Sequence, residues 1–88
     1  MKMPKQLKIG GHIFKVVVTK EGFTGDDYGA LDVETNTISI NSKLMQTNKE
    51  SALIHEMLHA INTTLDHELL DSLAEQLYQA LHDNGMLK

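Results

Sequence analysis

The chain has 88 residues, of which 41% are hydrophobic, and its 12 acidic residues against 8 lysines give a formal charge of -4. The absence of Arg and of a basic stripe argues against nucleic acid as a partner, and the absence of Cys excludes disulfides and thiolate metal sites. Because the sequence has no apolar stretch of signal-peptide or membrane-span length, we expect one small cytoplasmic domain without membrane contact.

The first half of the chain, about residues 5–41, is rich in predicted strands. Leu7 to Thr19 has the residues of a β-hairpin, because Gly10-Gly11 can adopt the positive φ angles that a two-residue turn requires. Gly and Asp dominate the segment from Glu21 to Gly29, which is typical of a loop. Within it, Asp26-Asp27 lacks the spaced ligand series of a calcium site and reads as solvated loop.

A second hairpin is predicted from Ala30 to Ile40, with its turn at Glu34-Thr35-Asn36. The alternation of apolar and polar residues places Ile38 and Ile40 towards the core. The two hairpins together predict a small, mostly antiparallel sheet of three to four strands.

The second half of the chain predicts two helices. Thr47 with Glu50 three residues later fits a capping box at the start of a helix over about 48–63. A second helix is predicted over about 66–82, with Asn84-Gly85 as its C-terminal stop. Since only a few residues separate the two helices, they should pack antiparallel. Strands followed by helices indicate a single domain of the α+β class over residues 1–88.

The motif that carries chemistry lies in the first helix. His55 and His59 are one turn apart and share a helix face, which is the arrangement of two zinc ligands. Glu56 lies close enough to act on water at the metal as a general base without ligating it. The other positions of this helix are mostly apolar, so two His and a Glu within it need a reason.

The third metal ligand should come from the second helix. His67 lies on the apolar face that is expected to meet the first helix, and Asp71, one turn on, would be its hydrogen-bonding partner. Glu68 falls on the solvated side, and Asp66 has the position of an N-cap; both stay open as alternative ligands. The fourth position would be water, and Zn2+ is preferred among the metals that imidazole suits.

Other polar residues carry weaker signals. Tyr28 and Tyr78 could polarise a substrate carbonyl, although a ring in the core with its hydroxyl in water is the more frequent role. His12 and His82 are typical of surface or capping histidines.

Two segments give the chain a family resemblance. The runs His55–Ile61 and His67–Ala74, continued by Leu77-Tyr78, resemble the small phage and prophage HExxH metallopeptidase-like proteins. These are similar to the ImmA/IrrE family and, more distantly, to minimal gluzincins. The ending Leu81–Asn84 also resembles the close of that phage group.

The resemblance implies a minimal zincin-like core that hydrolyses peptide bonds, with the strand Thr37–Ile40 aligning the substrate backbone. In the family the second helix supplies a Glu ligand, and that position falls on His67 here. A three-histidine site is one outcome of this departure; a register shift to Glu68 is the other.

Three functions follow from these observations. The first is a zinc-dependent peptidase that uses Glu56 as base and acts on a peptide or protein substrate such as a regulator. The second is a zinc-stabilised protein-interaction module without catalytic activity, and the third is an interaction domain without metal. A partner protein or a homo-oligomer could complete the cleft of so small a domain.

Overall fold

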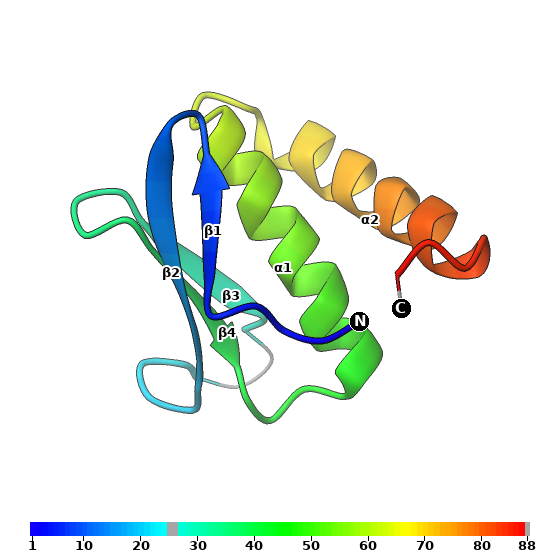
Figure 1. The fold of residues 1–88 in the computed structure, drawn as a ribbon, viewed down its shortest axis with the longest axis horizontal. Helices are drawn as coiled ribbons and strands as arrows, with labels where there is room; N and C mark the ends of the chain where they lie inside the picture. The colour runs from blue at the N-terminus through cyan, green and yellow to red at the C-terminus, as the bar shows by residue number, and fades with distance from the viewer. Residues whose placement is uncertain (25–26, 88) are drawn as a thin grey trace.

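The computed structural model describes residues 1–24 and 27–87, and in them a four-stranded sheet is followed by two helices (Figure 1). The strands are β1 (Gln6–Ile9), β2 (His12–Thr19), β3 (Gly29–Asp32) and β4 (Thr37–Asn41), and the helices are α1 (Gln46–Ile61) and α2 (His67–Asp83). The expected α+β class is confirmed. Asp26, one half of the Asp26-Asp27 pair, lies outside the described residues.

Both predicted hairpins are present. β1 and β2 pair antiparallel, with Ile9 opposite His12 across the turn. Gly10 and Gly11 have φ angles of 58° and 83°, and these positive values are what a two-residue turn of this kind requires. β3 and β4 also pair antiparallel, around a turn in which Asn36 adopts φ 51°, a conformation that Asn tolerates better than most residues.

A parallel strand pair joins the two hairpins and makes the sheet mixed. β4 runs parallel to β2, and the strand order is β1-β2-β4-β3. β4 is therefore an inner strand with a neighbour on each side, whereas β3 is an edge strand. The prediction that Thr37–Ile40 aligns a substrate backbone is wrong, because an inner strand has no free edge for a further strand.

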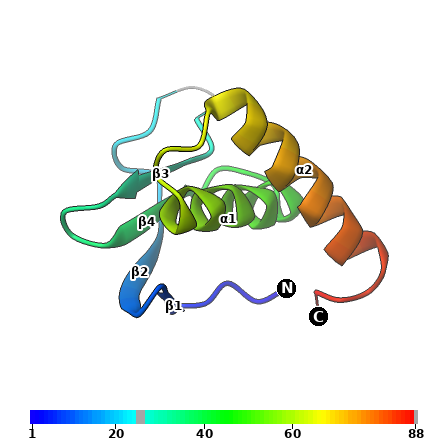
Figure 2. The same cartoon turned by 90° about the horizontal axis from the view of Figure 1, so that it is seen from above.

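The core lies between the sheet and α1, which covers one face of the sheet (Figure 2). Phe14, Ile38 and Ile40 of the sheet are buried against Ala52 and Leu53 of α1. The inward orientation predicted for Ile38 and Ile40 is confirmed, since neither side chain has any exposed surface. The position of α1, and with it that of the histidine motif, is thus fixed by the apolar face of the sheet.

Helix α2 lies on α1 and makes no extensive contact with another described element. Leu70 and Ala74 are the α2 residues buried in this contact. Asp66 caps the helix by accepting a hydrogen bond from the backbone N–H of Glu68 at 3.3 Å, as predicted for that residue. Over residues 1–24 and 27–87, neither helix is long and apolar enough to cross a membrane.

The C-terminal stop predicted at Asn84-Gly85 is confirmed. Gly85 has φ 70°, and its N–H donates to the carbonyl of His82 while that of Met86 donates to the carbonyl of Leu81. This pair of hydrogen bonds around a left-handed residue satisfies carbonyls that the last helical turn leaves free.

The capping box predicted from Thr47 and Glu50 is wrong. α1 begins at Gln46, its N-cap is Met45, and no side chain caps it. Glu50 is buried instead and accepts three hydrogen bonds: from the Met1 amino group at 3.2 Å, from Gln46 Nε2 at 3.0 Å and from the Tyr78 hydroxyl at 2.8 Å. Contacts between distant parts of the chain thus override a local capping pattern.

Glu50 ties the start of α1 to α2. Burial alone would raise the pKa of its carboxyl, but the hydrogen bonds from Gln46, Tyr78 and the Met1 amino group outweigh burial and hold the pKa below its ordinary value of 4.5. The pKa of Tyr78 is raised to about 12 by burial and by the Glu50 carboxylate. The carboxylate therefore adds stability at pH values above 4.5, and this contribution is lost as the pH falls through the lower folded pKa.

Tyr78→Phe should lower the free energy of unfolding by about 1–3 kcal/mol at pH 7, because it removes a donor from a buried charged acceptor. With fewer donors the folded pKa of Glu50 rises, so stability should also begin to fall at a higher pH during acidification. Urea unfolding followed by circular dichroism between pH 3 and 7 measures both effects. Tyr28→Phe is the matched control and should change stability by less than about 0.5 kcal/mol; an equal loss in the two variants would contradict the role of Tyr78.

Candidate metal and catalytic site

The motif lies in the second half of α1, where the helix turns three side chains towards α2 and the edge of the sheet. His55 and His59 are partly exposed, with side-chain exposures of 25% and 28%, whereas Glu56 is buried at 6%. A buried carboxylate on a helix that packs against the core needs a space between the helix and the sheet. The residue that makes this space comes from β3.

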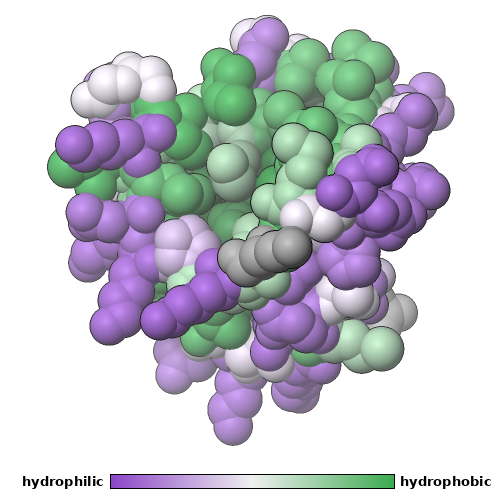
Figure 3. Space-filling view, turned by 45° about the vertical axis from the view of Figure 1, so that its right-hand side comes forward, coloured by the Kyte–Doolittle hydropathy of each residue, from purple (hydrophilic) through white to green (hydrophobic). Residues whose placement is uncertain are grey.

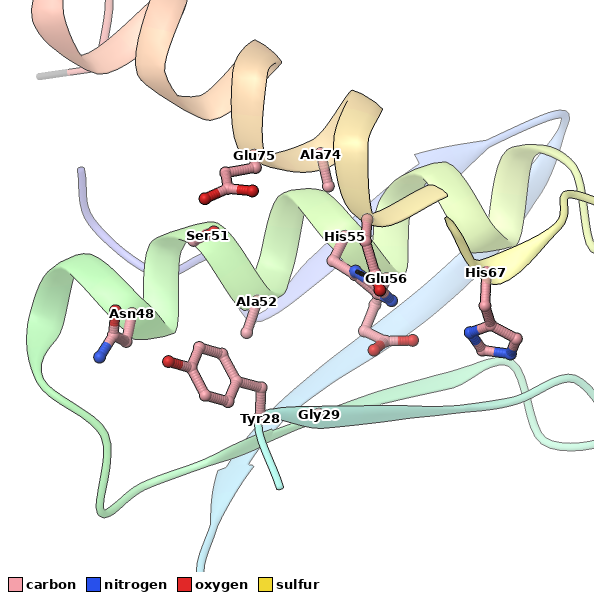
Figure 4. A pocket seen from close by; sticks show the side chains of 11 residues that line it. Tyr28, Gly29, Asn48, Ser51, Ala52, His55, Glu56, His67, Ala74 and Glu75 are labelled. Carbon is pink, nitrogen blue, oxygen red and sulfur yellow. Dashed lines mark ion pairs between the residues drawn. The ribbon is translucent and has the colours of Figure 1, made fainter. Parts of the chain in front are cut away.

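Gly29 makes room for Glu56. A Cβ at position 29 would lie 2.9 Å from the carbonyl oxygen of Ser39 and 3.3 Å from both Cγ and Oε2 of Glu56. Figure 4 shows the Glu56 carboxylate pointing from α1 towards the strand at Gly29. Glycine is thus needed here for space, not for a positive φ. The Gly and Asp content of residues 21–29 predicted a loop at Gly29 and did not indicate this role.

Burial dominates the chemistry of Glu56. It raises the pKa of the carboxyl above its ordinary value of 4.5, and the nearby imidazoles of His55, His59 and His67 offset this only in part. His59 also approaches directly, with Nδ1 3.6 Å from Glu56 Oε1. A carboxyl with a raised pKa is a stronger base than an exposed one, which suits a group that must accept a proton.

Asp71 of α2 pairs with His55 rather than with His67. The Asp71 Oδ1 atom lies 3.3 Å from His55 Nδ1. One turn separates residues 67 and 71, and because α2 lies along α1, residue 71 meets the earlier turn of α1. With Nδ1 directed at the Asp71 carboxylate, the His55 ring keeps Nε2 for a metal, which is how a ligating histidine with a carboxylate partner is arranged.

His67, the first residue of α2, lies beside the last turn of α1. The ring centres of His59 and His67 are 5.9 Å apart, with the rings 68° from parallel. Two imidazoles on one tetrahedral zinc have ring centres about 5 Å apart, because each ring centre lies about 3 Å from the metal. The distance between the ring centres of His59 and His67 therefore exceeds by only about 1 Å the distance expected for two imidazoles that bind the same zinc ion.

The two alternative third ligands are placed less favourably. The Asp66 carboxylate accepts the backbone N–H of Glu68, as an N-cap does, and Glu68 itself is exposed. His67, by contrast, lines the same pocket as His55 and Glu56.

The side chains as they stand do not form a finished metal centre. In the described part of the chain, no group of three or more His, Asp or Glu side chains is arranged as a ligand set. His59 Nδ1 faces the Glu56 carboxylate at 3.6 Å, which leaves Nε2 as the atom that could share a metal with His67. The donor set fits zinc in its chemistry, with three imidazoles and a buried carboxylate beside them, while its geometry needs side-chain rotation.

A pocket of about 450 Å3 opens beside the motif, between α1, α2 and β3 (Figure 4). Its volume lies within the range of about 300–1,000 Å3 that is typical of ligand pockets, so the small domain has its own cleft. Its walls are polar and acidic around the motif; besides His55, Glu56 and His67, the residues lining it are Tyr28, Gly29, Asn48, Ser51, Ala52, Asp71, Ala74 and Glu75.

Asn48 and Ser51 also line the pocket, and although no motif marks them, their spacing from His55 is a signal in the sequence. They lie seven and four residues before His55, which puts them on the same face of α1. Of the two tyrosines that could polarise a substrate carbonyl, Tyr28 lines this pocket, whereas the Tyr78 hydroxyl donates a hydrogen bond to Glu50.

The remaining histidines lie apart from this pocket's lining. His82 pairs with the neighbouring Asp83 at 3.1 Å, and His12 lines a smaller hollow of about 270 Å3 near the first hairpin. Both fit the surface role expected for them.

Gly29→Ala should lower the free energy of unfolding by about 1–3 kcal/mol, because the new methyl group would meet a backbone oxygen that cannot move aside. Urea unfolding followed by circular dichroism provides the measurement. Ala30→Val, which adds bulk at an exposed position of the same strand, should change stability by less than about 0.5 kcal/mol. A Gly29→Ala protein as stable as the parent would show that the backbone at Ser39 can move aside and that the glycine is not needed for space.

No protein-family model, curated protein or solved structure matches this chain. The function of the site therefore has to follow from its own residues: the paired histidines of α1, the buried Glu56, and the two α2 side chains, His67 and Asp71, that approach them.

Proposed function

We propose that this chain is a zinc-dependent peptidase, with His55, His59 and His67 as metal ligands and Glu56 as general base. The observation that carries the proposal is the convergence of two helices on one buried carboxylate. The ring centre of His67 in α2 lies 5.9 Å from that of His59, and Asp71 Oδ1 lies 3.3 Å from His55 Nδ1. Both α2 side chains line a pocket of about 450 Å3. The resemblance of these two segments to phage metallopeptidase-like proteins supports the same function.

Zinc, when bound, would polarise the substrate carbonyl and make water a nucleophile near neutral pH. Glu56 would accept the proton of the attacking water and pass it to the leaving amine. Asp71 would orient the His55 ring by its pairing with Nδ1, which leaves Nε2 for the metal. Gly29 leaves the space in which the Glu56 carboxylate is held.

The edge strand β3 is the element suited to hold a substrate backbone. One edge of β3 pairs with β4, and the other has no neighbouring strand in the described sheet. An extended peptide added there would gain main-chain hydrogen bonds, and Gly29, at the start of β3, lies against Glu56. This assigns the role expected of Thr37–Ile40 to Gly29–Asp32. A regulatory protein that exposes an extended segment fits such a site.

A second function is a zinc-stabilised interaction module. α2 is held to the rest of the fold by α1, through the buried Leu70 and Ala74 and a few polar contacts. A metal shared by the two helices would bind the folded state alone and stabilise it in proportion to its affinity. The same ligands serve both functions, and they differ in whether Glu56 is used.

Glu56→Gln should leave zinc in place and reduce peptide hydrolysis by about 100-fold to 10000-fold, because it removes the proton acceptor but no ligand. A fluorescence-quenched peptide library measures hydrolysis, and elemental analysis measures zinc. Glu68→Gln, a matched change at an exposed position, should keep parent activity. If the parent holds zinc but cleaves no peptide in the library, the interaction module becomes the better assignment; a Glu56→Gln protein that cleaves normally would refute the mechanism.

Zinc content should identify the third ligand. The parent should hold about one zinc per chain, and His67→Ala should lose most of it, whereas Glu68→Ala and Asp66→Asn should retain it. Asp71→Asn should bind zinc about 10–100-fold more weakly, because it removes the charge that pairs with His55 Nδ1 and helps to orient the ring. Elemental analysis and competition with a chelator test these expectations. Loss of zinc in Glu68→Ala with retention in His67→Ala would shift the site by one residue.

A further inference from the structure

Three leucines form an exposed stripe on α2. Leu69, Leu73 and Leu77 follow one another at intervals of four residues, so they lie on one helix face. Their exposures are 49%, 44% and 41%. Figure 3, which brings the α2 side of the molecule forward, shows a broad hydrophobic area bordered by hydrophilic side chains. We call these three residues the leucine stripe.

The packing of α2 on α1 does not need the leucine stripe. Leu70 and Ala74 are the α2 residues buried against α1, and they lie on the wheel between the stripe and the side that carries His67 and Asp71. α2 thus has one face packed on α1, one edge at the candidate site and a second, apolar edge that stays about half exposed in the described fold. Exposed apolar side chains gathered along one helix mark an interaction surface.

The charged side chains of α2 itself are all acidic, apart from its histidines. Residues 50–87 contain seven of the twelve acidic residues and none of the eight lysines, all of which lie in residues 1–49 or at position 88. On α2 the acidic side chains are exposed, with Glu68 next to the start of the stripe and Asp83 near its end. A partner that covers the stripe must therefore place its charges in a field that favours cations.

We propose that the leucine stripe docks a segment of another protein that presents apolar side chains flanked by Lys or Arg, such as a basic amphipathic helix. Apolar anchors at helical spacing would meet the three leucines, and the flanking cations would meet Glu68 and Asp83. This surface lies on the opposite edge of α2 from the candidate zinc site, so the inference does not depend on peptidase activity.

Two other occupants fit the charge less well. A second copy paired through α2 would bring two acidic helices together with no cation on either, which costs affinity. A membrane surface carries anionic headgroups, which the same acidic residues repel. The absence of Lys and Arg from residues 50–87 thus distinguishes a cationic protein segment from both.

The test uses the full chain and two synthetic probes, an 18-residue helical peptide of Leu and Lys and the same peptide with Glu in place of Lys. Fluorescence anisotropy should show that the Lys peptide binds at least about tenfold more tightly than the Glu peptide. Leu73→Ser combined with Leu77→Ser should weaken its binding by at least about tenfold, whereas the control Gln79→Ser, which shares the polar face of α2 with Glu68 and Glu75, should change it by less than about twofold.

Glu68→Lys combined with Asp83→Lys leaves the apolar surface intact and should weaken binding of the Lys peptide without lowering the melting temperature. This variant keeps the test decisive if the leucine variant proves unstable. Binding of the Lys peptide that is unaffected by both double variants would overturn the proposal. So would a parent that sedimentation velocity shows to be a dimer and that Leu73→Ser with Leu77→Ser makes monomeric, or a parent that binds phosphatidylserine vesicles through the leucines.

Discussion

The packing of α2 on α1 is the contact on which the candidate site depends, because residues of both helices must meet there. Leu70 and Ala74 bury the centre of this contact. Polar links reinforce it along its length: the Tyr78 hydroxyl donates to Glu50 at 2.8 Å, and Asp71 pairs with His55 at 3.3 Å. A helix held in this way keeps a fixed register against its neighbour, and a fixed register is what brings the α2 side chains to the paired histidines.

Two carboxylates buried on the same helix show how the surroundings decide the role of a residue. Glu50 has three donors, which outweigh its burial and lower its pKa, so it is a structural anion. Glu56 is buried almost as deeply, but burial outweighs the influence of its histidine neighbours and raises its pKa. A carboxylate left short of donors is the one suited to proton transfer, since its charged form is not already stabilised.

The lysines are concentrated in residues 1–49, up to the first turn of α1, whereas residues 50–87 carry acidic side chains and no lysine. α2 lies within this acidic part of the chain. One of its edges faces the pocket, and the other carries Leu69, Leu73 and Leu77. Acidic side chains favour a positively charged ligand at each edge: a metal ion at the pocket edge and a cationic protein segment at the leucine edge. In so small a domain, one amphipathic helix with an apolar arc wider than its packing needs can supply both surfaces.

The sequence by itself determined what depends on local chemistry: the Gly10-Gly11 turn, the Asn84-Gly85 stop, the helix that carries the motif and the α+β order of elements. These follow from backbone preferences and from the period of apolar residues, which act over a few positions. Tertiary structure decided the rest. It made β4 an inner strand, buried Glu50 in place of a capping box, and paired Asp71 with His55. Each of these depends on how distant segments approach, and strand order and helix register are set by the packing of the whole core.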